Sequence, residues 1–118
     1  MRYAMLICAT PDDWADDNPL ATPEAMQEVL DWFTQWGGAG KIADGGVDLD
    51  SPAKARTIRA RGGRPVVTDG PYLELKEVVG GLVLLQVADL DEAVRIGSTW
   101  PGLRAPGVSV EVRPIIEH

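Results

Sequence analysis

In a strand, every second side chain points to the same face. Two segments of the chain are apolar at both the odd-numbered and the even-numbered positions, which is the pattern of a strand covered on both faces. Residues 80–87, GGLVLLQV, form the most apolar run of the chain. Residues 2–9, RYAMLICA, have two apolar sets, which are Tyr3, Met5 and Ile7 against Ala4, Leu6 and Cys8. Strands with this pattern lie at the centre of a sheet. The sequence therefore predicts two central strands that need cover on both sides.

Capping signals predict two helices. Residues 22–24, TPE, supply a capping threonine, a proline for the first helical position and an acid at the positive end of the helix dipole. Gly37 and Gly38 end this helix. Asp89 caps the second helix, with Glu92 three residues on, and that helix ends before the WPG sequence at residues 100–102.

Weaker strand signals occupy the rest of the chain. In residues 54–68 the residue character alternates along the chain on either side of a Gly-Gly turn, which predicts a hairpin. Residues 108–115, VSVEVRPI, predict the last strand. Residues 40–51 are compatible with a loop or a short irregular strand. Five of the eleven basic residues lie in residues 54–64. We interpret them as protection of an exposed edge strand rather than as an anion site.

The element order predicts a single α+β domain spanning residues 1–118. Two crossover helices would lie on one face of a mainly antiparallel sheet, in the split βαβ plan. The opposite face would be left bare, although both central strands are apolar on that side as well. The simplest cover is the same face of a second copy, so we expect a homodimer.

Composition narrows the classes of partner. The chain has 118 residues and a net charge of −7, which disfavours nucleic acid and anionic membrane surfaces as partners. No apolar run approaches the ~18 residues that a membrane span needs. The start of the chain reads as a strand rather than as a signal peptide. A single cysteine, Cys8, forms no internal disulfide, which is typical of the cytoplasm.

Metal and cofactor signatures are missing from the sequence. One cysteine and one histidine, His118, provide neither spaced metal ligands nor a Ser-His-acid triad. No G-x-G-x-x-G follows a predicted strand, so we expect no cofactor. The aspartates in residues 10–21 lack the ligand spacing of an EF-hand, which favours a solvated loop.

Four motifs in order give the chain a family resemblance. Residues 67–94, VTDGPYLELKEVVGGLVLLQVADLDEAV, and residues 108–115 resemble the DGPF-motif branch of the YCII-related proteins. Asp69, Gly70 and Pro71 match the signature, with Tyr72 where the family has Phe. Three further motifs also match the family. They are the acid-x-basic-acid continuation, DLDEA at residues 89–93 and EVRP at residues 111–114. Leu75 replaces the commoner Thr.

The resemblance implies a ferredoxin-like fold that dimerises in the manner of the α-β barrel proteins. It also implies a cleft between sheet and helices or at the dimer seam. Genes of the DGPF branch often adjoin genes for extracytoplasmic-function sigma factors, which suggests regulation. A His-Asp pair has been suggested as the active centre in other relatives. Here the one histidine is the last residue, His118, and does not fit that pattern.

Asp69 is the candidate catalytic residue. An aspartate before Gly-Pro commonly caps a turn through nearby backbone amides. At a strand end beside a cleft it can instead act as a general acid or base. Arg113, Lys76, Glu74 and Glu77 are the candidate ligand-binding residues. Arg113 would pair with Asp69 or a nearby glutamate, or would bind a small anionic molecule.

Three functional hypotheses remain open from the sequence. The first is a small-molecule enzyme or binding protein with Asp69 as acid or base. The second is a non-catalytic regulatory or binding module that acts with a sigma factor. In the third, the motif residues are scaffold alone, forming a turn, a cap and an ion pair. Fold by itself does not decide among them.

Overall fold

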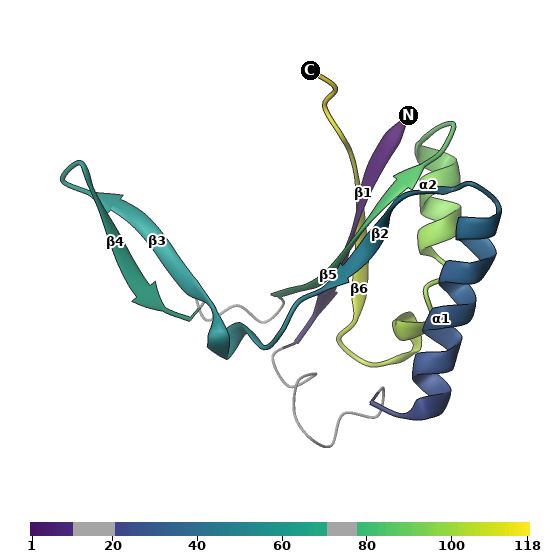
Figure 1. Ribbon diagram of the computed structural model, residues 1–118, viewed down its shortest axis with the longest axis horizontal. Helices are drawn as coiled ribbons and strands as arrows, with labels where there is room; N and C mark the ends of the chain where they lie inside the picture. The colour runs from purple at the N-terminus through teal and green to yellow at the C-terminus, as the bar shows by residue number, and fades with distance from the viewer. Residues whose placement is uncertain (11–20, 71–77) are drawn as a thin grey trace.

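The computed structural model describes residues 1–10, 21–70 and 78–118 (Figure 1). In chain order its elements are β1 (Arg2–Ala9), α1 (Pro23–Gly38), β2 (Ile42–Asp48), the 3₁₀ turn η2 (Pro52–Lys54), β3 (Arg56–Arg61), β4 (Arg64–Asp69), β5 (Val78–Gln86), α2 (Leu90–Gly97), the 3₁₀ turn η3 (Pro101–Arg104) and β6 (Ser109–Pro114). Most of the predicted elements are therefore present with nearly the predicted bounds.

The main sheet has four strands in the order β2-β5-β1-β6, and all neighbours are antiparallel. The strands with two apolar faces, β1 and β5, lie at its centre, with Tyr3 opposite Leu85 and Met5 opposite Val83. Both helices cover the same face (Figure 1). This arrangement confirms the α+β, ferredoxin-like prediction. The sheet of the single chain is open, with β2 and β6 as its edges.

Apolar side chains between the sheet and the helices form the core. Met5, Val83 and Leu85 from the sheet pack with Trp32 of α1 and Ile96 of α2, and all five are buried. Burying a side chain of this size contributes ~1.5–3 kcal/mol. This layer therefore fixes both helices on one face of β1 and β5.

Both predicted helix caps are present. Thr22 Oγ1 accepts a hydrogen bond from the Ala25 N–H at 3.1 Å, and an Asp89 carboxylate oxygen accepts one from the Glu92 N–H at 2.9 Å. Each cap satisfies a backbone donor that the helix leaves without a partner. The side chains therefore fix where α1 and α2 begin.

Residues 42–48 form a strand, which resolves the choice between loop and strand. β2 pairs with β5 in an irregular register, with shifts on both sides of Asp44. At Gly46 a Cβ atom would lie 2.9 Å from Phe33 Cζ, so only glycine lets β2 approach α1 this closely. The glycines that obscure the strand in the sequence are what let it pack under the helix.

The predicted hairpin is present and lies apart from the main sheet. β3 and β4 form a separate two-stranded sheet instead of an edge of the main sheet. Gly62 and Gly63 both have positive φ, at 58° and 77°, as a two-residue type I′ turn requires. The edge of the main sheet beside β5 is formed by β2.

The face of the main sheet that carries no helix is largely apolar. Ala4 pairs with Leu84 and Leu6 pairs with Leu82, and these four side chains are half-buried. They alternate with the core residues of β1 and β5, so they point away from the helices. We call this surface, formed by Ala4, Leu6, Leu82 and Leu84, the helix-free face.

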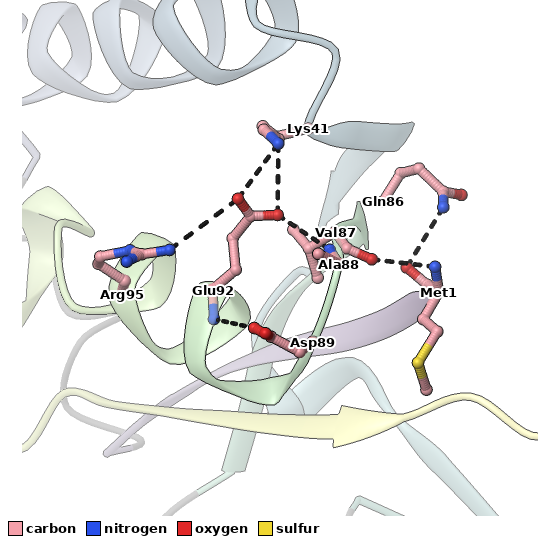
Figure 2. Close-up of polar contacts among 8 residues, drawn as sticks. All are labelled: Met1, Lys41, Gln86, Val87, Ala88, Asp89, Glu92 and Arg95. Atoms are coloured by element: carbon pink, nitrogen blue, oxygen red, sulfur yellow. Dashed lines mark hydrogen bonds and ion pairs between the residues drawn. The ribbon is translucent and has the colours of Figure 1, made fainter.

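A polar network around Glu92 joins the start of α2 to the strands (Figure 2). Glu92 Oε1 accepts from the Ala88 N–H at 2.9 Å, and Lys41 Nζ donates to both carboxylate oxygens at 3.2 and 3.3 Å. The Lys41 carbonyl accepts in turn from the Gln86 N–H at 2.8 Å. The hydrogen bond from Ala88, followed by that from Lys41, lowers the pKa of Glu92.

We expect Glu92→Gln to weaken the fold in a pH-dependent way. Because the pKa of Glu92 is lowered in the folded state, its carboxylate stabilises the protein at pH values above the ordinary glutamate pKa of 4.5. That contribution disappears as the pH falls through the folded-state pKa. The variant should therefore be less stable than the wild type at pH ~7 and should approach it near pH ~3. Urea unfolding at both pH values measures the difference.

The exposed neighbour Asp91, in the same helical turn, provides the control as Asp91→Asn. Its stability difference from the wild type should be smaller at neutral pH. An equal deficit for Glu92→Gln at both pH values would contradict the assigned role of the carboxylate charge.

Candidate functional site

A cavity of about 490 Å³ opens between α1, η3 and the ends of three strands. Its lining is mostly apolar and includes Ile7, Met26, Val29, Trp100 and Val108. A second hollow of about 240 Å³ adjoins it and also involves Ile7, Val29 and Trp100. Because the walls come from distant parts of the chain, the cavity exists only in the folded domain.

The Trp100 ring forms one wall of this cavity and packs against two further aromatic rings. Trp100 lies edge-on to Trp32, with centroids 5.0 Å apart, and edge-on to Phe33 at 6.1 Å. Trp32 and Phe33 meet edge-on as well, at 5.1 Å. Such edge-to-face pairs stabilise by ~0.5–1.5 kcal/mol beyond the burial of their area. The wall is therefore held rigidly against α1.

The hydroxyl of Thr99 fixes two indoles behind that wall. Thr99 Oγ1 accepts from Trp32 Nε1 at 2.9 Å and from Trp36 Nε1 at 3.3 Å, and it donates to the Ile96 carbonyl at 2.6 Å. The i,i+4 pair of tryptophans in α1 is thus anchored to the end of α2. This contact supports the view that both indoles are structural.

Among the described residues, three charged side chains line the cavity, and two of them have partners. Arg104 of η3 forms an ion pair with Glu28 of α1. Asp50 accepts from Lys54 Nζ at 2.8 Å and from the Ser51 N–H, and these hydrogen bonds, with Lys54 first, lower the pKa of Asp50.

Asp48, the third charged lining residue, has no ion pair among the described residues. It is exposed and ends β2. Its carboxylate is therefore available to a ligand. The Trp100 indole N–H likewise donates no hydrogen bond within the described part of the chain, so the cavity offers one free acceptor group and one free donor.

This combination can recognise a small molecule by shape and by charge. An apolar body would fill the space between Ile7, Val29 and Trp100, and a cationic or donor group would reach Asp48. The lining includes neither histidine nor cysteine. Across the described residues no group of three potential metal ligands is found. In the same part of the chain, no helix has both the length and the hydropathy needed to cross a bilayer.

Asp69 lies outside the lining of this cavity. It ends β4, its side chain is 90% exposed, and it forms an ion pair with Arg56 at 3.1 Å. The following Gly70 has φ of 79° and donates to the Ala55 carbonyl at 2.7 Å, while Thr57 Oγ1 donates to the Gly70 carbonyl at 2.7 Å. In the single chain, these contacts hold Gly70 against the start of β3.

Arg113, the one other predicted site residue among the described residues, is not paired with Asp69. Arg113 lies on β6 opposite Ala4, and its Nε is 3.9 Å from a carboxylate oxygen of Glu111. It is exposed at the helix-free face, away from the cavity lining. Glu74, Lys76 and Glu77 lie outside the described residues. Ligand binding by these four residues stays a prediction.

Sequence reasoning missed Asp48 and Trp100 as site residues. Asp48 lies in a segment that was compatible with a loop, and Trp100 was used only as the end of a helix. One local signal exists for Trp100, because the residues after it are Pro101 and Gly102. A Cβ at Gly102 would lie 2.7 Å from Trp100 Nε1, so glycine makes room for the indole.

Comparison with known proteins gives two consistent matches. The family model of the YCII-related domain matches residues 1–118. An uncharacterized protein from Rhizobium meliloti (strain 1021) is 38% identical over 119 residues, which cover 98% of this chain and 92% of that protein. The family resemblance seen in the sequence is thereby confirmed, whereas the narrower DGPF branch stays a prediction.

We expect Thr99→Val to destabilise the protein by about 1–3 kcal/mol, because it leaves the buried Trp32 indole N–H without its acceptor. Valine keeps the shape of the side chain. Urea unfolding followed by circular dichroism measures the loss. Ser98→Ala, which removes an exposed hydroxyl at the adjacent position, should change stability by no more than about 0.5 kcal/mol. Equal effects of the two variants would contradict the anchoring role of Thr99.

Proposed function

Because the chain belongs to the YCII-related family, we propose that it is a homodimeric protein that binds a small, largely apolar molecule in the cavity between α1, η3 and the sheet. The observation that supports this most directly is the combination of an open apolar cavity with the unpaired Asp48 carboxylate. Ligand pockets typically have volumes of ~300–1,000 Å³ and a few polar groups that orient the ligand.

The charges of the lining favour a ligand with a cationic group. Asp48 and Asp50 place two carboxylates in the lining, and Arg104, the one basic residue in the described part of the lining, is already paired with Glu28. An ammonium group bound at Asp48 would also lie in a cavity that contains the Trp100 ring, and cations are attracted to the faces of such rings. A primary amine on a small hydrophobic skeleton fits these features.

The other functional hypotheses from the sequence stay predictions. Acid-base catalysis by Asp69 requires a substrate at the hairpin corner, and a small anionic ligand requires Arg113 at the helix-free face. The regulatory alternative with a sigma factor, and a location in the cytoplasm, rest on the resemblance and on composition.

The homodimer is supported by the helix-free face. In one chain, helices cover only one side of β1 and β5, and Leu6, Leu82 and Leu84 stay half-buried on the other side. A second copy placed face to face would remove these side chains from water, at ~25 cal/mol per Å² of apolar area. The same surface on both copies would form a two-fold interface.

Ligand binding is tested with amines and the carboxylic acids of matching carbon skeletons. We expect some amines to raise the melting temperature and the matching acids to leave it unchanged. At a concentration 100 times the dissociation constant, binding stabilises a protein by about 2.7 kcal/mol. Val29→Trp, which fills the cavity, should abolish the shift, and Asp48→Asn should remove the preference for amines.

Leu30→Trp is the matched control, since Leu30 is the next residue of α1, is 53% exposed and does not line the cavity. This variant should keep the wild-type response. The proposal fails if no amine stabilises the wild type, or if Val29→Trp responds as strongly as Leu30→Trp does.

The homodimer is tested by light scattering at micromolar concentration. We expect the wild type to have twice the protomer mass and Leu84→Glu to shift it towards the protomer, because the substitution buries charges at the seam. Val94→Glu, at an exposed position of α2, should stay dimeric. Circular dichroism establishes that both variants are folded. A wild type with the mass of one protomer would exclude the homodimer.

A further inference from the structure

The larger cavity and the second hollow beside it share part of their lining. We call the second hollow the inner hollow. The described residues that line both spaces are Ile7, Met26, Val29, Asp48, Gly80 and Trp100, and Asp48 is the charged one among them. An ammonium group bound at Asp48 would therefore lie where the two spaces meet, with room for the rest of the ligand on both sides.

The strand register shows that the two spaces extend in opposite directions from Asp48. Asp48 of β2 and Ile7 of β1 both lie opposite Gly81 of β5, so these positions form one row across the sheet. Val83, two residues further along β5, lines the inner hollow but not the larger cavity. Ala9, two residues further along β1, lines only the larger cavity. Because β1 and β5 are antiparallel, Val83 and Ala9 lie on opposite sides of the row.

The Phe33 ring limits the inner hollow. It packs edge-on against Trp32, with the centroids 5.1 Å apart, and a Cβ at Gly46 would lie 2.9 Å from its Cζ atom. The ring is thus held between α1 and the glycine of β2. Beside it, Val83 is buried, and Asp48 is the one charged residue in the described part of this lining. The inner hollow therefore suits an apolar group of limited length.

The other side of Asp48 is more polar. Asp50 and Arg104 line the larger cavity but not the inner hollow. Asp50 is paired with Lys54 and Arg104 with Glu28, so neither adds an unbalanced charge. A guanidinium group has more N–H donors than one carboxylate takes up, so Arg104 keeps hydrogen-bonding capacity within its ion pair. This part of the cavity suits a neutral polar group, because a ligand carboxylate would meet two aspartates.

We propose that the site selects a chiral amine whose amine-bearing carbon has one apolar branch and one neutral polar branch. The ammonium group binds Asp48, the apolar branch fills the inner hollow as far as Phe33, and the polar branch accepts a hydrogen bond from Arg104. The inference rests on the amine binding of the proposed function. Since three different groups are bound at three places, one enantiomer fits better than its mirror image. Phe33 and Arg104 are then the residues that determine specificity.

Isothermal titration calorimetry of the wild type with both enantiomers of leucinol tests the inference. Isopentylamine, which is leucinol without the hydroxymethyl branch, and leucine, which has a carboxylate at that place, are the reference ligands. We expect the dissociation constants of the two enantiomers to differ by about tenfold or more. The better enantiomer should bind about 3- to 10-fold more tightly than isopentylamine, because it gains one hydrogen bond. Leucine should bind more weakly than isopentylamine.

Two variants test the two branches separately. Arg104→Ala should remove the advantage of leucinol over isopentylamine. Arg95→Ala, at an exposed position of α2 that also lies near a glutamate, is the matched control and should keep that advantage. Phe33→Leu enlarges the inner hollow and should shift the preference from leucinol towards phenylalaninol, which has a larger apolar branch. Circular dichroism establishes that the variants are folded.

The outcomes separate this inference from the proposed function. If amines bind and the two leucinol enantiomers bind equally well, the two-branched ligand is wrong and the amine site stands. Leucinol that keeps its advantage in Arg104→Ala would overturn the role of Arg104, and an unchanged preference in Phe33→Leu would overturn that of Phe33. A wild type that binds none of these amines would overturn both proposals.

Discussion

The pairing of β1 with β5 is the constraint on which the rest of this structure depends. Each strand presents apolar side chains to both sides, and the chain has two helices that cover one side. Burial of Met5 and Leu85 beneath those helices determines the register of the sheet and the position of the core. The apolar character of Leu6 and Leu84 then has no explanation within one chain. The proposed homodimer follows from this difference between the two faces.

The same layer of helices also creates the cavity. Trp32 is buried in the core and linked to Thr99, so the aromatic wall that includes Trp100 belongs to the rigid part of the domain. The outer part of the cavity is different, because Asp48 lies where the chain leaves β2. The rigid apolar interior would select ligands by their shape. The charged group at its margin would select them by their charge.

The sequence was sufficient for features that depend on local chemistry. The caps at Thr22 and Asp89, the Gly-Gly turn and the two central strands each have a signal within a few residues. β2 could not be distinguished from a loop, because it depends on pairing with β5 and on the space that Gly46 leaves for Phe33. The cavity could not be found either, since its walls are brought together only by tertiary packing. Asp69 was singled out by its motif, but its surroundings depend on the fold.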